Sequence, residues 1–130
     1  MLENARRLVA IVDDDMSVRT AIASLLKANG IEVEGFSSAR AFLSSAQMRE
    51  TGCVTLDLRM PGMDGLELQR HLAGTDPQIQ IVFVTAYRTA EIHEEAMRAG
   101  AIAVVSKPFS EEELVSAIRL AFETGTKRSN

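Results

Sequence analysis

Five polar side chains of this sequence stand at or just after the ends of apolar runs: Asp13, Asp14, Asp57, Thr85 and Lys107. Carboxylates held a few ångströms apart repel one another by about 1 to 4 kcal/mol per pair, depending on the effective dielectric constant. Such a cluster needs a cation. Hard carboxylate oxygens favour Mg²⁺ or Mn²⁺, and Lys107 supplies a second, permanent positive charge. A carboxylate kept ionised in this way is an oxygen nucleophile for phosphorus.

The residue types indicate a task for each group. Asp57 is the candidate acceptor of a phosphoryl group, Thr85 can donate its hydroxyl to one phosphoryl oxygen, and the ammonium of Lys107 can balance the charge of another. A turn with a proline and a glycine follows Asp57, and this turn can direct the backbone carbonyl of Arg59 toward the metal. These parts suit a site in which a carboxylate accepts phosphoryl, held by metal and lysine rather than by a glycine-rich loop.

Each of these groups also has a plain structural interpretation. The run Asp13 to Asp15 can cap a helix, and we expect Asp15 to do so. An isolated Asp57 is typical of a turn, an isolated Thr85 of a strand end, and an isolated Lys107 of a solvated surface. Only their joint placement favours the chemical interpretation, and that placement depends on the elements that carry them.

The apolar runs have the length and composition of β-strands. Residues 8–12, 53–56, 79–84 and 101–105 are short, partly β-branched and almost free of polar residues, which is typical of parallel strands covered on both faces. Residues 31–36 alternate between apolar and polar side chains instead. That alternation predicts a half-exposed strand at one edge of the sheet.

Helical patterns separate these strands. Helices are expected after Asp15 as far as Gly30, over Ala39–Met48, after Asp64, from Thr89 to Gly100, and after the capping-box sequence at Ser110. Strands that alternate with helices form a doubly wound α/β domain with right-handed crossovers. The carboxyl ends of its parallel strands meet at one edge, where ligands bind. The five polar side chains are therefore expected to converge in one crevice.

Composition limits the classes of function. The chain has 130 residues, of which 46% are hydrophobic and 25% charged, as expected of one globular domain. We expect residues 1–124 to form this domain and residues 125–130 to be a tail or the start of a linker. The apolar runs are far shorter than the roughly 20 residues of a membrane helix, so the chain is expected in the cytoplasm. A net charge of −4 argues against direct nucleic-acid binding by this domain.

At the polar strand ends the sequence resembles the receiver domains of two-component response regulators. The matching segments are IVDDD at 11–15, LDLRMPGMDG at 56–65, VTA at 84–86 and SKPF at 106–109. Together they are specific, although any one alone is weak. The resemblance implies a flavodoxin-like (CheY-like) five-stranded parallel sheet of order 2-1-3-4-5 with helices on both faces.

The resemblance also implies a metal site and a phosphoryl donor. Asp57 would accept its phosphoryl group from a sensor histidine kinase. Asp14 would be a direct ligand of Mg²⁺, and Asp13 would act largely through water. Asp57 and the backbone carbonyl of Arg59 would complete the ligand set.

For the bound phosphoryl group, the resemblance implies contacts to Thr85, the backbone of Ala86 and Lys107. The peptide bond between Lys107 and Pro108 is expected to be cis, an isomer found in only about 5–6% of such bonds.

One position departs from the family pattern. The family commonly has Tyr or Phe three residues before the lysine, where the ring swings inward after phosphorylation, but this chain has Val104 there. Tyr87, two residues after Thr85, is a candidate substitute in the switch. Arg59 and Tyr87 also flank the expected path of the attacking water, so the lifetime of the phosphoryl group is expected to depend on them.

The predicted function is a phosphorylation-gated switch rather than an enzyme. Phosphorylation would move Thr85 inward and alter the face made by the fourth helix, fifth strand and fifth helix, through which the domain can form a homodimer. The candidate residues for that face are Ile92, Met97, Val104 and Val115. Segments such as FSSARAFL resemble FixJ-type transcriptional regulators, whose receiver precedes a helix-turn-helix domain. The alternative is a stand-alone phosphorelay or motility regulator.

Two further functions use a similar fold. A phosphohydrolase of the haloacid dehalogenase type also forms an aspartyl phosphate, but it needs a second carboxylate where this chain has Arg59. A flavodoxin-like carrier of a small ligand would not require Lys107 or the acidic residues after the first strand. Both are weaker interpretations than the switch.

Overall fold

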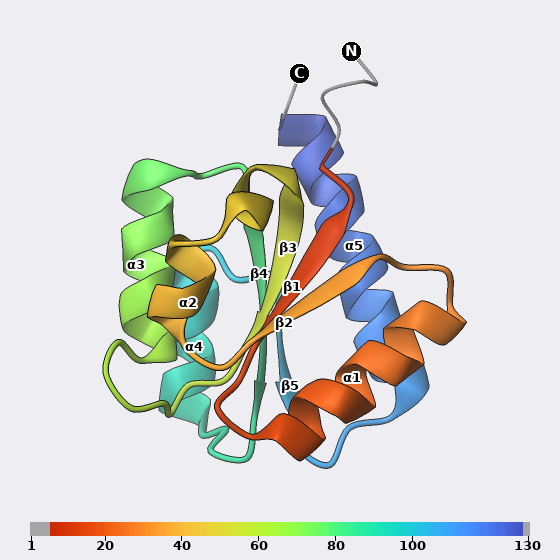
Figure 1. Cartoon of the computed structure of the whole chain (residues 1–130). Coiled ribbons are helices and arrows are strands. Elements are labelled where there is room, and N and C mark those ends of the chain that lie inside the picture. Colours follow the sequence, from red (N-terminus) through yellow and green to blue (C-terminus); the bar gives the residue numbers. More distant parts are fainter. Residues whose placement is uncertain (1–5, 129–130) are drawn as a thin grey trace.

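A parallel five-stranded β-sheet forms the middle layer of the structure (Figure 1), a computed structural model that describes residues 6–128. The strands are in the order β2-β1-β3-β4-β5, and each pair of neighbours is parallel. This is the flavodoxin-like order that the sequence resemblance implies. The strands are β1 (Leu8–Val12), β2 (Val33–Phe36), β3 (Thr51–Leu56), β4 (Gln80–Thr85) and β5 (Ala103–Ser106).

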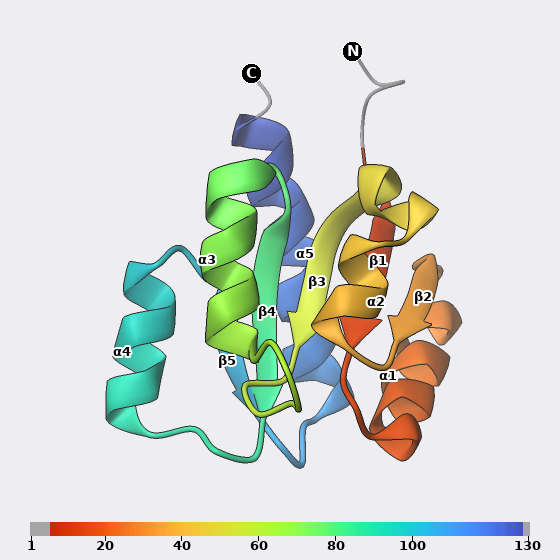
Figure 2. The same ribbon diagram turned by 60° about the vertical axis from the view of Figure 1, so that its left-hand side comes forward.

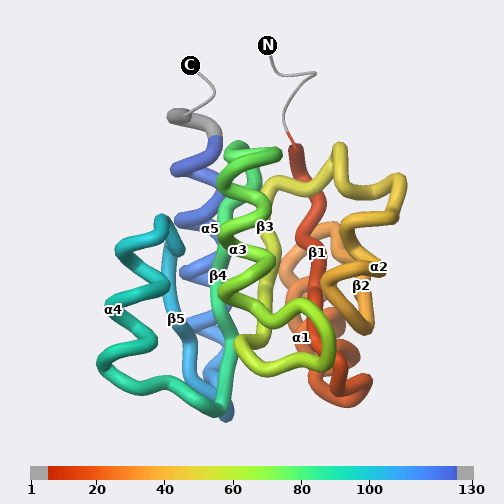
Figure 3. The backbone as a smooth tube through the Cα atoms, turned by 90° about the vertical axis from the view of Figure 1, so that its left-hand side faces the viewer, coloured from red at the N-terminus to blue at the C-terminus, as the bar shows by residue number. Residues whose placement is uncertain are grey.

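Helices cover both faces of the sheet (Figures 1 and 2). The helices α1 and α5 lie on one face, and α2, α3 and α4 lie on the other; the tube in Figure 3 shows α3 and α4 side by side. The fold is therefore the predicted three-layer α/β arrangement. The bounds are α1 (Met16–Ala28), α2 (Ala39–Leu43), the 3₁₀ helix η2 (Ala46–Glu50), α3 (Gly65–Thr75), α4 (Ala90–Arg98) and α5 (Glu111–Arg128).

Every residue of β1, β3 and β4 is buried, which explains their continuous apolar sequences. The edge strand β2 is half-exposed, as its alternation predicts. The sheet separates two apolar clusters. One contains Phe42, Leu68 and Phe83 under α2, α3 and α4; the other contains Leu26 and Ile118 under α1 and α5.

The predicted helix caps are confirmed. Asp15 accepts the backbone N–H of Ser17 at 2.9 Å, and Thr89 and Ser110 accept the N–H groups three residues on, at 3.1 and 3.0 Å. Asp64 forms a complete capping box with the third residue of α3. These side chains satisfy backbone donors that have no partner within the helix. They therefore fix the residue at which each helix begins.

Several boundaries differ from the sequence prediction, most of them by one or two residues. The expected helix over residues 39–48 breaks after α2, because the Ser45 hydroxyl donates to the carbonyl of Phe42 at 2.7 Å and competes with the helical pattern there. Strand β5 begins at Ala103 rather than at Ala101, since the N–H of Ala101 closes the end of α4 by donating to Ala96.

Helix α5 continues to Arg128, beyond the predicted end of the domain at residue 124. Gly125 lies against the side chain of Gln80 at the start of β4, so the polar end of α5 still packs on the body. The division into a domain over 1–124 and a tail or linker over 125–130 stays a prediction, and residues 129 and 130 lie outside the described residues. None of the helices among residues 6–128 combines the length and the apolar character that crossing a membrane requires.

Candidate functional site

The carboxyl edge of the sheet gathers the predicted site residues. Asp13 follows β1, Asp57 follows β3, Thr85 ends β4, and Lys107 follows β5. Backbone hydrogen bonds extend the ladder into the site: Asp57 N–H donates to Val12 at 3.2 Å, and Lys107 N–H donates to Thr85 at 2.9 Å. The sheet itself therefore fixes where these side chains begin.

Lys107 lies between two carboxylates. Its Nζ is 3.0 Å from Asp13 Oδ2 and 3.1 Å from Asp57 Oδ2. Burial acts to lower the pKa of Lys107, but the hydrogen bonds to Asp13 and Asp57 outweigh it, so the pKa is raised and the ammonium stays charged. The peptide between Lys107 and Pro108 is cis, as the resemblance implies.

Asp13 is the more deeply buried partner of Lys107, with 2% of its surface exposed. Its Oδ1 accepts the N–H of Asp15 at 2.9 Å. Burial nevertheless raises the pKa of Asp13, because the loss of hydration outweighs these hydrogen bonds and the charge of Lys107. The carboxyl groups of Asp13 and Asp57 thus share the ammonium of Lys107.

A third carboxylate, that of exposed Asp14, joins the buried Asp13 and Asp57. One oxygen of each lies within 4.8 Å of the others. Three hard oxygen donors grouped in this way fit a divalent cation such as Mg²⁺, which takes one or two carboxylates together with water. The residues thus suit the metal that the sequence predicts.

The turn after Asp57 forms the wall of the site. Arg59 N–H donates to Asp57 Oδ1 at 3.4 Å, and the predicted role of the Arg59 carbonyl as a metal ligand stays a prediction. The guanidinium of Arg59 lies over the ring of Tyr87, 4.4 Å from its centre. This contact joins the β3–α3 loop to the β4–α4 loop.

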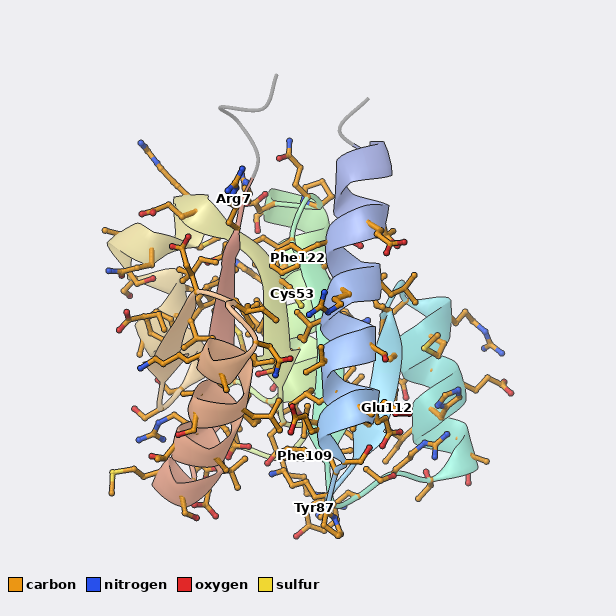
Figure 4. All side chains as sticks on the ribbon, turned by 90° about the vertical axis from the view of Figure 1, so that its right-hand side faces the viewer. Arg7, Cys53, Tyr87, Phe109, Glu112 and Phe122 are labelled. Atoms are coloured by element: carbon orange, nitrogen blue, oxygen red, sulfur yellow. The ribbon has the colours of Figure 1, made fainter. Side chains whose placement is uncertain are left out.

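Thr85 is fully buried, and its Oγ1 accepts the N–H of Tyr87 at 3.0 Å. Ala86 follows it on the exposed side of the loop. Tyr87 is 49% exposed and lies at the site end of the sheet (Figure 4). Val104 is buried in β5 in the cluster under α2, α3 and α4.

The predicted output face is only partly at the surface. Met97 is 38% exposed and Ile92 is half-buried, but Val104 and Val115 are buried. These two valines therefore add no exposed surface to the face in this structure, because both side chains fill the layers beside the sheet, and their part in the face stays a prediction.

Two structural residues of the site escaped the sequence prediction. A Cβ on Gly65 would collide with the backbone carbonyl of Asp57, and Gly65 N–H donates to Leu58 at 3.0 Å. The only sequence signal was a glycine at the first position of a helix, where its low propensity is unfavourable. Arg19 donates to the carbonyl of Asp13 at 2.7 Å; one basic residue on a helix gives no such signal.

A parallel sheet of order 2-1-3-4-5 with three carboxylates and a lysine at its carboxyl edge defines a flavodoxin-like domain with an acidic cation pocket. The chain belongs to the response regulator receiver domain family, whose model matches residues 9–119.

Individual relatives agree with this assignment. The chain is 42% identical over 122 residues to response regulator protein TmoT of Ectopseudomonas mendocina, which covers 94% of this chain and 56% of that protein. It is 39% identical over 115 residues to transcriptional regulatory protein FixJ of Rhizobium meliloti (strain 1021), covering 88% and 56%. The chain thus spans about half the length of the curated relatives that it matches.

Solved structures show the same fold. The low-resolution structure of response regulator StyR matches with a TM-score of 0.87 and 43% identity, covering 96% of this chain and 63% of that one. The structure of FixJ-N matches with a TM-score of 0.81 and 39% identity, covering 89% of this chain and 93% of that one.

The chain is a receiver domain of two-component response regulators, related to transcriptional regulators. Receiver domains of this family are phosphorylated by histidine kinases and act as switches.

Proposed function

We propose that Asp57 accepts a phosphoryl group from the phosphohistidine of a sensor kinase, in a reaction that depends on Mg²⁺ or Mn²⁺. The observation that carries this proposal is the position of Lys107, whose Nζ contacts both Asp13 and Asp57 at 3.0 and 3.1 Å. The ammonium offsets the negative charge of Asp57 and already stands where the negative phosphoryl oxygens would arrive.

In the proposed step, a carboxylate oxygen of Asp57 forms a bond to phosphorus while the phosphorus–nitrogen bond of the phosphohistidine breaks, and the ring nitrogen leaves with the electron pair. Lys107, the Thr85 hydroxyl and the backbone N–H of Ala86 bind the phosphoryl oxygens. Asp14, Asp57 and the Arg59 carbonyl would hold the metal, together with Asp13, which would act largely through water. The bound cation would offset charge that Lys107 alone leaves unbalanced.

The proposed output depends on two alternative partners of the Thr85 hydroxyl, the backbone N–H of Tyr87 and the phosphoryl group. In this structure its oxygen accepts the Tyr87 N–H, and reaching a phosphoryl group would draw Thr85 and the following loop toward Asp57. Because α4 begins at Ala90, directly after this loop, its position would change with phosphorylation. We propose that Tyr87 replaces the aromatic side chain missing at Val104 in this movement.

The face of α4, β5 and α5 would then bind a second phosphorylated copy and, in a longer protein, control a DNA-binding domain. The relatives named as transcriptional regulatory proteins support this output over a stand-alone relay. The domain would be a cytoplasmic switch, with self-phosphorylation and self-dephosphorylation as its only chemistry. Its acidic net charge of −4 is unsuited to nucleic-acid binding by the domain itself.

Acetyl phosphate with Mg²⁺ tests the chemistry. We expect a phosphate-sized mass gain in the intact protein, lost in Asp57→Ala and strongly reduced when EDTA removes the metal. Asp64→Ala, which removes a carboxylate from the same segment but only at the cap of α3, is the matched control and should still gain the mass. A gain that persists in Asp57→Ala would contradict Asp57 as the acceptor.

A further inference from the structure

Helix α4 is weakly attached to the body of the domain. It has nine residues, AEIHEEAMR, and Ala96 is the only one that is buried. Its N-terminal end is tied to the site by the loop that carries Thr85 and Tyr87. A helix with so little buried surface depends on individual contacts for its position.

One buried side chain of α3 holds the C-terminal end of α4. Gln69 is 2% exposed, and its Nε2 donates to the backbone carbonyl of Ala96 at 3.0 Å. The same carbonyl accepts the N–H of Ala101, which closes the helix. Figures 2 and 3 show α3 and α4 lying side by side, so this bond runs directly between neighbouring helices.

The Gln69 amide is unusual because its oxygen remains unused. Within residues 6–128, Gln69 Oε1 is buried and has no hydrogen-bond partner, and a buried acceptor without a partner is unfavourable. The neighbouring inward positions of α3 are Leu68 and Leu72, so an apolar residue would suit this layer better. The amide donor toward Ala96 is the feature that an apolar side chain would lack.

A second contact between the same helices is much weaker. Arg70 Nη1 lies 4.0 Å from Glu95 Oε2, and both side chains are more than half exposed. Exposed ion pairs of this length contribute little. Of these two polar contacts between α3 and α4 within residues 6–128, the Gln69 bond is therefore the stronger.

We propose that Gln69 is a positioning residue that anchors the C-terminal end of α4 to α3, so that a displacement of Thr85 reaches only the N-terminal half of α4. The proposal rests on the proposed function for its second half, the response to phosphorylation. Helix α3 is itself fixed to the site, because Gly65 lies against the carbonyl of Asp57. The anchor thus holds α4 to a helix whose first residue lies against Asp57.

The test compares Gln69→Met with Gln80→Met. Methionine keeps the length of the side chain and removes both the donor and the unpaired oxygen, and a cavity of about 240 Å³ beside Gln69 gives it space. Gln80 is equally buried, but its Nε2 donates to the nearby carbonyl of Gln78 and not to α4. Gln69→Leu, measured in parallel, ensures that a packing defect of one side chain does not decide the result.

Hydrogen exchange of residues 93–101 in the unphosphorylated protein is the first measurement. We expect roughly 3- to 10-fold faster exchange in Gln69→Met, the range that one neutral buried hydrogen bond supports, with global stability to urea unchanged or higher. Gln80→Met should leave this segment unchanged. Unchanged exchange in both Gln69 variants, or an increase that only follows a loss of global stability, overturns the anchor.

The second measurement repeats the exchange after treatment with acetyl phosphate and Mg²⁺. At a concentration where the phosphorylated protein stays monomeric, changes in the native protein within α4 and its flanking loops should be confined to residues 86–93, and in Gln69→Met they should spread to residues 96–101. Equal changes at 96–101 in both proteins overturn the confinement. If Asp57 gains no phosphate at all, the proposed function fails, while the first measurement still decides whether Gln69 anchors α4.

Discussion

Lys107 and Asp13 are 94 positions apart in the sequence, yet the ammonium of Lys107 lies 3.0 Å from a carboxylate oxygen of Asp13. The two residues follow strands on opposite sides of the central strand β3, and Lys107 reaches across to Asp57 as well. An internal ammonium therefore partly neutralises the acidic cluster before any metal binds. Three carboxylates share this ammonium, so the neutralisation is incomplete.

The raised pKa of Asp13 predicts a pH-dependent stability. The folded protein holds this proton more tightly than the unfolded chain, so the free energy of unfolding falls as pH rises from the ordinary value near 3.8 through the raised folded value. Asp13→Asn should flatten this fall and, at pH 7 without divalent cations, unfold with a free energy higher by about 1 kcal/mol. Urea unfolding at pH 4 and pH 7 measures both effects.

Asp14→Asn is the control for the Asp13 prediction, because Asp14 is exposed and lies in the same cluster. Its gain in stability should be smaller. An equal gain would show that repulsion within the cluster, rather than burial of Asp13, is the dominant cost. Saturating Mg²⁺ should raise the free energy of unfolding of the native protein by more than it raises that of Asp13→Asn. The reason is that the cation balances a carboxylate that the variant lacks.

Gly65 and Gly74 provide a matched pair on one helix. A Cβ on Gly65 would meet the carbonyl of Asp57, whereas a Cβ on Gly74 would meet nothing within 4 Å. Gly65→Ala should therefore destabilise the protein by about 2 kcal/mol and reduce phosphorylation, because the backbone of Asp57 must shift. Gly74→Ala should instead stabilise it by about 0.5 to 1 kcal/mol through helix propensity.

Thermal or urea unfolding of the two alanine variants, together with the mass gain from acetyl phosphate, checks this prediction. If Gly65→Ala unfolded and reacted like the native protein, the close approach of α3 to Asp57 would have no functional importance.

We expect the lifetime of the phosphoryl group on Asp57 to depend on the contact between Arg59 and Tyr87. The guanidinium lies over the ring, and the sequence predicts that both side chains flank the path of the attacking water. Removing the ring in Tyr87→Ala should admit water more freely and shorten the lifetime roughly two- to fivefold, the range that an exposed cation–π contact supports.

The decay of the phosphorylated mass after removal of acetyl phosphate measures this lifetime. Arg88→Ala is the control, because this neighbouring side chain contacts His93 instead and should leave the decay unchanged. A longer lifetime in Tyr87→Ala would mean that the ring assists the attacking water rather than shielding Asp57. In the same variant, unchanged phosphorylation-dependent dimerisation would exclude Tyr87 from the switch.

The strands and the polar residues at their ends were predictable because each is a local feature. Buried parallel strands need continuous apolar runs, so the runs placed Asp57 and Thr85 at one edge without any knowledge of distances. The caps at Asp64 and Thr89 were predictable for the same reason, since a cap depends on the next three residues.

Features that depend on which elements meet were not predictable from one sequence. Gly65 matters because α3 passes against Asp57, and Gln69 matters because α4 lies beside α3; neither neighbour is close in sequence. The break at Ser45 was missed because a serine hydroxyl can point to solvent or to a backbone carbonyl, and the choice depends on packing. The end of α5 was missed because polar composition resembles a tail even where Gly125 packs on Gln80.

Strand β1 begins, and α5 ends, on the side of the sheet opposite Tyr87 and Phe109 (Figures 1 and 4). A strand of ordinary length separates those sides by about 17–20 Å, more than twice the distance of about 8 Å over which salt screens a charge. For a neighbouring module tethered there, the charge of the aspartyl phosphate would be largely screened. Such a module would respond to phosphorylation through the displacement of a helix instead.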